Sequence, residues 1–242
     1  MKLIAAHWSA PVQVKAYTTT RVGGVSLPPF ASMNLGDHVG DDSVAVSANR
    51  TKLAQHLGLS LPPQWLSQVH GTDLVEAQAD SRVFQADACW SKQPGQACVI
   101  MTADCLPVFF TDQQASRVAV AHAGWRGLVE GVLENTLQLF PDPGQVIAWL
   151  GPAIGPDAFE VGGEVRQQFC ERLAASDAAF KPSPNEGKWL ANIYQLARLR
   201  LQRAGVTAIT GGDHCTFSES DLFYSYRRES VTGRMASIIW IE

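Results

Sequence analysis

Three apolar segments near the middle of the chain constrain its fold more than any other feature. They are Ala97–Thr102, Leu106–Thr111 and Arg117–Ala121, and short polar segments separate them. Apolar runs of this length, rich in β-branched and aromatic residues, predict strands that are buried on both faces. The chain therefore needs a sheet that other elements cover from both sides.

The remaining segments predict strands and helices that interleave around this centre. The predicted strands are Val12–Thr19, Trp65–Val69, Leu74–Ala77, Val146–Leu150, Val206–Thr210 and Ala236–Ile241. One predicted helix starts at N-cap candidates in Asp41–Ser43 and runs to about Leu57, and the others are Leu128–Phe140, Val161–Ala175 and Leu190–Ala204. Because the order lacks a strict βαβ rhythm, we expect a mixed-sheet, layered α/β domain. With no linker or internal repeat in the sequence, residues 1–242 are expected to form one domain.

Composition narrows the class of protein. Of 242 residues, 46% are apolar and 17% charged, which suits a globular enzyme with a sizeable core. A net charge of −4 argues against nucleic acid as the main partner. No apolar run is long enough to span a membrane, and Met1–Ala6 is too short for a signal peptide. Five cysteines without a CxxC pair predict free thiols in a reduced compartment, so we expect a cytoplasmic protein.

His70, Cys105 and His122 each lie where a predicted strand meets glycine, aspartate or proline. Functional side chains commonly occupy such positions on a rigid scaffold. Two imidazoles and one thiolate can hold Zn²⁺ and leave the fourth position open, as in catalytic zinc sites. Their spacing does not force them together, and spacing alone favours a core cysteine with two unrelated histidines. Their position at strand ends favours the metal site.

Two segments next to these residues carry further polar groups. Asp104 precedes Cys105, and in an extended segment the two side chains face opposite ways. We therefore expect Asp104 to hold a neighbouring imidazole or backbone N–H, or simply to cap local backbone. In Gly124–Gly127 the glycines allow close approach to a ligand, and Arg126 matches phosphate or carboxylate. A turn with a surface arginine is the simpler alternative.

Other candidate ligand-binding groups lie far apart in the sequence. Asn34 offers an amide to a base or sugar, whereas Arg50 lies in a predicted helix, where a solvated arginine is the ordinary interpretation. Cys215 lies shortly before Phe223–Arg228, a run that predicts either a strand with core aromatics or an aromatic pocket wall. His214 is interpreted as a bystander.

Taken together, the motifs resemble the YfiH-like family, whose members are called polyphenol oxidases, purine nucleoside phosphorylases or peptidoglycan editing factors. The resemblance extends over nearly the whole chain. It rests on Arg21–Ser26, Ser32–Gly36, Gln68–Gly71, Ala103–Pro107, His122–Gly127, Gly151–Gly155, Cys215-Thr216, Ser225–Arg227 and Thr232–Arg234.

The resemblance implies a mixed β-sandwich with outer helices, in four layers α/β/β/α, like that of a deamidating bacterial toxin domain. It implies zinc ligands at His70, Cys105 and His122, with Cys105, His122 and Asp104 as catalytic residues. The substrate-binding candidates are Asn34, Arg50, Gln68, Arg126, Cys215 and Arg227. Among them, Arg50, Arg126 and Arg227 are candidates to hold phosphate, since guanidinium groups bind oxyanions in pairs of hydrogen bonds.

The implied activity is phosphorolysis of adenosine, inosine, guanosine and methylthioadenosine, accompanied by hydrolytic deamination of adenosine. An open zinc site suits the deamination because zinc activates water. The expected partners are a nucleoside and phosphate, and the expected state is a monomer or weak homo-oligomer. One alternative is a copper-dependent phenol oxidase, although six histidines are few for several copper ions. Another is a Cys–His amide hydrolase acting on peptidoglycan precursors, with Cys105 as nucleophile and His122 as base.

Overall fold

Two β-sheets packed face to face form the centre of the protein, and the computed structural model describes all of residues 1–242. The larger sheet is mixed, with the order β14 (Ala208–Gly211), β10 (Val146–Leu150), β8 (Leu106–Asp112), β9 (Val118–Ala123), β6 (Ala88–Ser91) and β4 (Leu74–Glu76). The smaller sheet is antiparallel, with the order β1 (Leu3–Ala5), β2 (Val14–Thr19), β15 (Met235–Ile241) and β7 (Cys98–Thr102).

The other elements flank these sheets. The helices are α1 (Ser43–Leu57), α2 (Trp125–Glu130), α3 (Val132–Leu137), α4 (Gly163–Arg172) and α5 (Ile193–Arg203), with short 3₁₀ turns at Pro143–Gln145 and Ala174–Ala179. A three-stranded sheet has the order β11 (Glu160–Gly162), β13 (Lys188–Ala191) and β12 (Phe180–Pro182), and β3 (Leu66–Ser67) pairs with β5 (Phe84–Gln85). None of these helices combines the length and apolar character that crossing a bilayer requires.

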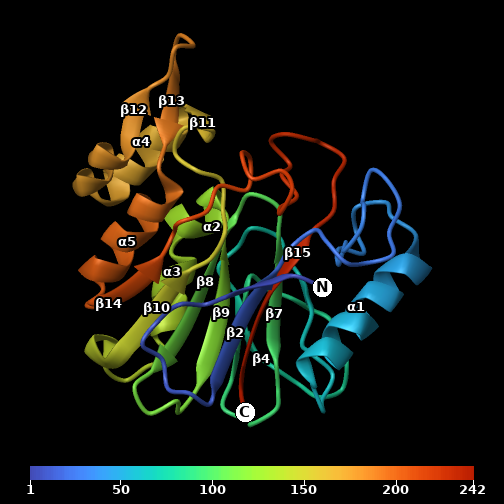
Figure 1. Ribbon diagram of the computed structural model, residues 1–242. Helices are drawn as coiled ribbons and strands as arrows, with labels where there is room; N and C mark the ends of the chain where they lie inside the picture. The colour runs from blue at the N-terminus through green and yellow to red at the C-terminus, as the bar shows by residue number, and fades with distance from the viewer.

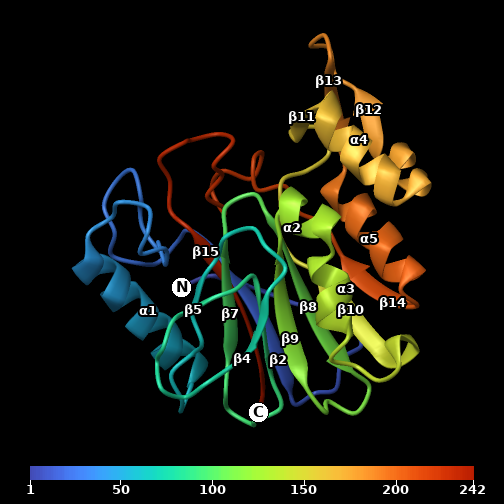
Figure 2. The same ribbon diagram turned by 180° about the vertical axis from the view of Figure 1, so that it is seen from behind.

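Helices cover the outer face of each central sheet (Figures 1 and 2). Helix α1 lies against the four-stranded sheet, and α2, α3 and α5 lie against the six-stranded sheet. Three buried clusters fill the spaces between successive layers: one under α1, one between the sheets and one under the other helices. The layers run helix, sheet, sheet, helix, and the expected mixed α/β fold is confirmed.

Strands β8 and β9 explain why the central segments are apolar throughout. Successive side chains of a strand point to opposite faces. Phe109, Val118 and Val120 therefore face the smaller sheet, whereas Val108 and Phe110 face the helices. The prediction of three buried strands is confirmed, but the first of them, β7, belongs to the other sheet.

Helix boundaries differ from the sequence prediction in three places. The helix predicted over Leu128–Phe140 begins earlier, at Trp125, and is divided into α2 and α3 by Gly131, whose φ is +106°. The predicted helix starts at Val161 and Leu190 lie instead in strands β11 and β13. These two strands pair with each other across a long stretch of sequence, so tertiary contact overrides their local pattern.

Both ends of α1 lie at residues that commonly cap helices. The Asp42 side chain accepts a hydrogen bond from the N–H of Val44, and Gly58 ends the helix in the left-handed conformation.

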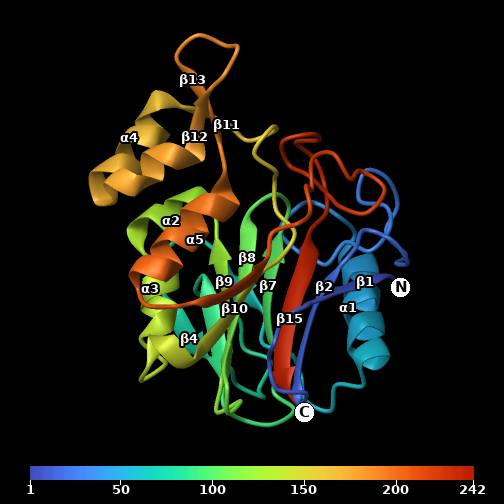
Figure 3. The same cartoon turned by 60° about the vertical axis from the view of Figure 1, so that its left-hand side comes forward.

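Residues 20–40 and 212–234, which lack helices and strands, lie side by side at one end of the sheets (Figure 3). The hydrogen bond from the Tyr224 hydroxyl to the carbonyl of Phe30 joins them.

Phe109 provides a test of the packing between the sheets. Its side chain is 0% exposed, and its ring stacks on Trp149 with a centroid separation of 5.5 Å. Phe109→Ala should lower the free energy of unfolding by about 3–5 kcal/mol, because it leaves a cavity in a closed core. Urea unfolding followed by circular dichroism measures the change. The control, Val12→Ala at an 84% exposed site, should stay within about 0.5 kcal/mol. A loss under about 1 kcal/mol for Phe109→Ala contradicts the packing.

Candidate active site

A pocket of about 550 Å³ is lined by residues from β7, from β9 and from the segment before β15. Its wall combines three metal-capable side chains, three arginines and several aromatic rings. The lining residues are His38, Gln68, His70, Met101, Thr102, Ala103, Asp104, Cys105, His122, Trp125, Arg126, Ile154, Phe159, Tyr226, Arg227 and Arg234.

His70, Cys105 and His122 come together in this pocket, as predicted. His70 lies in the loop between β3 and β4, Cys105 directly precedes β8, and His122 lies within β9. Their potential ligand atoms all lie within 4.8 Å of one another, and 3.7 Å separates Cys105 Sγ from His70 Nε2. His122 is only 3% exposed, whereas His70 is exposed, so the group has one buried and one open side.

The three side chains fit a metal ion. Zinc bonds of about 2.3 Å to sulfur and about 2.0–2.1 Å to nitrogen place these atoms about 3.6 Å apart in a tetrahedral site. The distance from Cys105 Sγ to His70 Nε2 is close to this value. Because the protein supplies three donors in this group, a metal bound here keeps a coordination position for another ligand.

Asp87, which the sequence analysis missed, organises two of the three residues. Its buried carboxylate accepts a hydrogen bond of 2.8 Å from His122 Nδ1, which leaves His122 Nε2 for the site. The same carboxylate accepts from the backbone N–H groups of Val69, His70 and Gly71. Burial by itself would raise the pKa of Asp87, but its hydrogen bond with His122 and the charge of that ring lower it. An aspartate inside the apolar segment 84–90 was the available signal.

The surroundings of Cys105 and His122 favour their charged forms when no metal is bound. Burial alone would raise the pKa of the Cys105 thiol, but the charge and hydrogen bond of His122, together with His70, lower it to about 6. Burial alone would lower the pKa of His122, but the Cys105 thiolate and Asp87 raise it to about 9. Between these pH values the pair consists of thiolate and imidazolium. Thiolate is the form that binds metals and attacks electrophiles.

Gly124 makes room for this group. A Cβ atom at position 124 would lie 2.7 Å from His70 Cδ2 and 3.1 Å from Cys105 Sγ. At position 127, a Cβ atom would lie 2.7 Å from the carbonyl oxygen of Gly71. The expected role of these glycines was close approach to a ligand, but the structure uses them for close approach of the His70 loop.

Asp104 holds distant loops in place. Its φ of +93° is not extended, so the reason given for its orientation was wrong. Its carboxylate accepts from the Thr216 hydroxyl at 2.6 Å and from the backbone N–H of Arg227 at 2.7 Å. Of the two predicted partners, a backbone N–H and an imidazole, the structure contains the first. Asp104 thus fixes the segment that brings Tyr226 and Arg227 to the pocket.

Three of the predicted substrate-binding residues make contacts within the protein. Gln68 lines the pocket, but its amide pairs with both backbone groups of Met101. Asn34 is fully buried, and its amide bonds to backbone and to Asp41, so its placement contradicts contact with a base or sugar. Arg50 is absent from the lining, because its guanidinium donates to the Leu35 carbonyl.

The arginines of the pocket are only partly those predicted. Arg126 and Arg227 line it as expected, and both are exposed. Arg126 lies over the ring of Trp125 at 4.5 Å, and Arg227 donates to the carbonyl of Ala158. The third, Arg234, belongs to a recognised motif but was not predicted as a site residue; its position beside β15 was the missing information.

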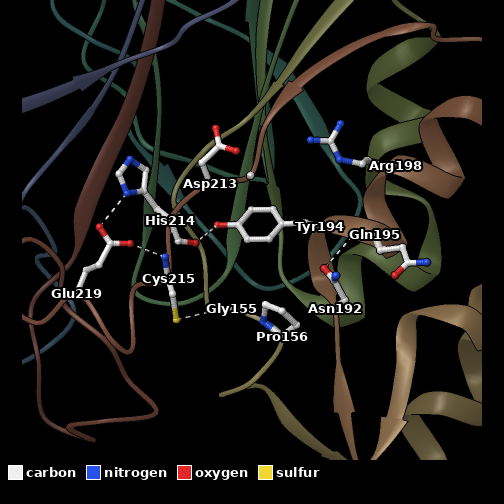
Figure 4. A pocket seen from close by; sticks show the side chains of 11 residues that line it. Gly155, Pro156, Asn192, Tyr194, Gln195, Arg198, Asp213, His214, Cys215 and Glu219 are labelled. Atoms are coloured by element: carbon white, nitrogen blue, oxygen red, sulfur yellow. Dashed lines mark hydrogen bonds and ion pairs between the residues drawn. The ribbon is translucent and has the colours of Figure 1, made fainter.

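Cys215 belongs to a different pocket, of about 430 Å³ (Figure 4). Its sulfur accepts a hydrogen bond from the N–H of Gly155, and its own N–H donates to Glu219. His214 pairs with the same Glu219 at 2.9 Å, so this histidine lies apart from the metal-capable group. Cys215 therefore does not line the pocket that contains His70.

Comparison with known proteins places the chain in a family. The family model described as multi-copper polyphenol oxidoreductase laccase matches residues 15–242. The chain is 52% identical to the purine nucleoside phosphorylase YfiH of Escherichia coli over 242 residues, which cover 99% of each chain. The chain belongs to the YfiH family. A purine nucleoside phosphorylase of Pseudomonas aeruginosa is 57% identical to this YfiH-family chain, over 99% of the chain and 98% of the relative.

Solved structures of the YfiH family show the same fold. A Neisseria meningitidis protein of family DUF152 is 47% identical and superposes over 100% of both chains with a TM-score of 0.95. The YfiH protein of Bacillus licheniformis, at 32% identity, has a TM-score of 0.90 over 95% of this chain and 93% of the relative. The predicted family is confirmed.

Gly124→Ala tests whether the YfiH-family pocket needs this close packing. The added methyl displaces His70 and Cys105, so affinity for zinc should fall on the order of tenfold or more. Competition with a chromophoric chelator measures the affinity. Gly163→Ala is the matched control, because its Cβ would meet nothing nearer than 3.8 Å. Equal zinc affinity in the two variants would show that the packing at position 124 is unimportant.

The pH dependence of alkylation tests the ion pair. In metal-free protein, iodoacetamide should modify Cys105 with a midpoint near pH 6, because the lowered pKa keeps the thiolate present down to that pH. His122→Ala removes the cation and should move the midpoint upward, and added zinc should slow the reaction. Peptide mass spectrometry separates Cys105 from the other thiols. A midpoint above about pH 8, near that of an ordinary cysteine, contradicts the ion pair.

Proposed function

We propose that the chain is a zinc-dependent purine nucleoside phosphorylase that acts on adenosine, inosine, guanosine and methylthioadenosine and also deaminates adenosine. The observation that carries the proposal is one pocket in which a metal-capable group, arginines and aromatic rings face the same space. The names of the Escherichia coli and Pseudomonas aeruginosa relatives support it.

Phosphate binding is the task of the arginines. A guanidinium matches two oxygens of a phosphate with parallel hydrogen bonds. Arg126, in α2, and Arg227, in the segment between β14 and β15, supply such groups. Asp104 accepts a hydrogen bond from the backbone N–H of Arg227 and so fixes the point from which the Arg227 side chain extends. In the reaction, an oxygen of hydrogen phosphate forms a bond to C1′ as the C1′–N9 bond breaks. The products are ribose 1-phosphate and the free purine, which takes up the proton that hydrogen phosphate gives up.

The purine has aromatic surfaces to pack against. Trp125, Phe159 and Tyr226 line the pocket, and Tyr226 is exposed. Flat rings bury a purine and orient it by stacking. Because these rings lie in the same wall as Arg126 and Arg227, base and phosphate are brought into one space, which lowers the entropic barrier to their reaction.

The metal-capable group suits the second activity. When bound at His70, Cys105 and His122, zinc supplies Lewis-acid chemistry of the kind that hydrolytic deamination needs. Asp87 keeps the His122 ring turned so that Nε2 faces this position. Deamination replaces the amino group of adenosine by oxygen from water and releases ammonia, which gives inosine.

Two other functions have an observation in their favour. The description of the matching family model favours a copper-dependent phenol oxidase. The thiolate–imidazolium pair of Cys105 and His122 favours a Cys–His amide hydrolase, such as one that edits peptidoglycan precursors. The three functions differ in what they consume: phosphate, dioxygen or only water.

Adenosine incubated with zinc-loaded protein, with and without phosphate, distinguishes them. Adenine and ribose 1-phosphate should appear only with phosphate, whereas inosine should form in both samples. Cys105→Ala should lower both rates on the order of 100-fold or more. The control, Cys170→Ala, changes a thiol on α4 outside the pocket and should have no effect.

The same experiment contains the results that would overturn the proposal. They are absence of base release under anaerobic, zinc-replete conditions, together with oxidation of phenols in air after copper is added. Amide hydrolysis that needs neither phosphate nor metal would instead establish the Cys–His hydrolase.

A further inference from the structure

Arg234 is the least exposed of the three arginines that line the pocket. Strands β15 and β7 are antiparallel, with Met235 opposite Thr102. Arg234 directly precedes this pair and Ala103 directly follows it, so the paired strands bring Arg234 to the segment that leads to Cys105. Burial lowers the pKa of Arg234, while the charges of Cys105, Asp104 and Tyr226, which line the same pocket, act in the opposite direction.

The protein holds Arg234 firmly on three sides. Its Nη1 donates to the carbonyls of Thr232 and Gly233, both at 3.0 Å. Its backbone N–H donates at 2.8 Å to the fully buried Asn34 amide. Its aliphatic part packs on Gly36, where a Cβ would come within 2.8 Å of Arg234 Cγ. The guanidinium is therefore placed before any ligand arrives, which reduces the entropy lost on binding.

Arg234 forms no ion pair, although the carboxylate of Asp104 acts on its charge from further away. No aspartate or glutamate oxygen lies within 4.0 Å of it, whereas Arg50 pairs with Asp37 and Arg200 with Glu134. A half-buried cation without an ion pair is costly unless an anion arrives to share the site. The neighbouring Thr102 hydroxyl is also buried, without a hydrogen-bond partner, and lines the same pocket. Two polar groups are thus left for a ligand.

We propose that Arg234 is the fixed arm of an oxyanion subsite beside Cys105, and that inorganic phosphate is the oxyanion it holds. The proposal rests on the proposed phosphorylase function, and it assigns the inner phosphate contact to a residue outside the predicted set. Arg126 and Arg227, being exposed, then close on the phosphate from the rim. Arg50, whose charge is already paired, has no part in it.

Phosphate binding in the absence of nucleoside tests this assignment with the zinc-loaded protein. Isothermal titration with inorganic phosphate should give a Kd that rises roughly 10- to 100-fold in Arg234→Gln, since a charge-assisted pair of hydrogen bonds is lost. Arg234→Lys should give an intermediate value, because it keeps the charge but not the fork. Arg82→Gln, an exposed arginine paired with Asp80, is the matched control and should bind as the unaltered protein does.

Four further measurements separate phosphate binding from folding and from binding of a nucleotide. Zinc content and thermal melting should be unchanged in Arg234→Lys, which covers the case in which Arg234→Gln fails to fold. In adenosine phosphorolysis, the KM for phosphate should rise while the KM for adenosine stays the same. Titration with adenosine 5′-monophosphate in phosphate-free buffer examines the other source of a phosphate group.

Each result decides between the two proposals. Unchanged phosphate Kd in folded Arg234→Gln and Arg234→Lys overturns the subsite and leaves the phosphorylase intact. Arg234-dependent phosphate binding without any phosphorolysis upholds the subsite and overturns the phosphorylase. Arg234-dependent binding of the nucleotide, with none of inorganic phosphate, shows that the subsite holds a phosphate carried by the substrate and overturns the assignment to inorganic phosphate.

Discussion

One buried carboxylate supports the whole site. Asp87 accepts three backbone N–H groups from the loop after β3 and the Nδ1 proton of His122, while its own carbonyl accepts the His122 N–H. A charge that is 0% exposed requires such full pairing. The pairing holds His70 at a φ of +60°, a conformation that a residue with a side chain rarely adopts. Without Asp87, His70 and His122 would lose the shared hydrogen-bond acceptor that positions both residues.

A rigid floor and a looser rim follow from this arrangement. The floor consists of His122 within β9 and Cys105 at the start of β8, both set by paired strands. The rim consists of segments without regular structure, fastened to the floor by Asp104 through Thr216 and Arg227. The pocket thus combines a metal-capable centre set by strands with binding groups carried by loops that Asp104 fastens to it.

Local signals made part of this predictable from the sequence. The cap at Asp42 and the glycine at position 58 bound α1, and the apolar runs gave the central strands. Asp87 escaped because its partners lie 16–35 residues away, and no local pattern marks such contacts. Arg50 and Arg234 could not be ranked for the same reason. Arg234 reaches the pocket only because β15 pairs with β7. Arg50 donates a hydrogen bond to the Leu35 carbonyl, a contact that only the folded chain creates.

The number of metal-binding side chains limits how many copper ions an oxidase of this sequence could hold. Clusters of several copper ions need several sets of histidines, yet His70, Cys105 and His122 form the one group of three metal-capable side chains in the protein. His38 lies in the pocket as a single exposed side chain, and His214 pairs with Glu219 elsewhere. An oxidase built on this chain would have to work at a single centre. Unpaired guanidinium groups beside that centre serve no evident purpose for an uncharged phenol, but they attract an oxyanion.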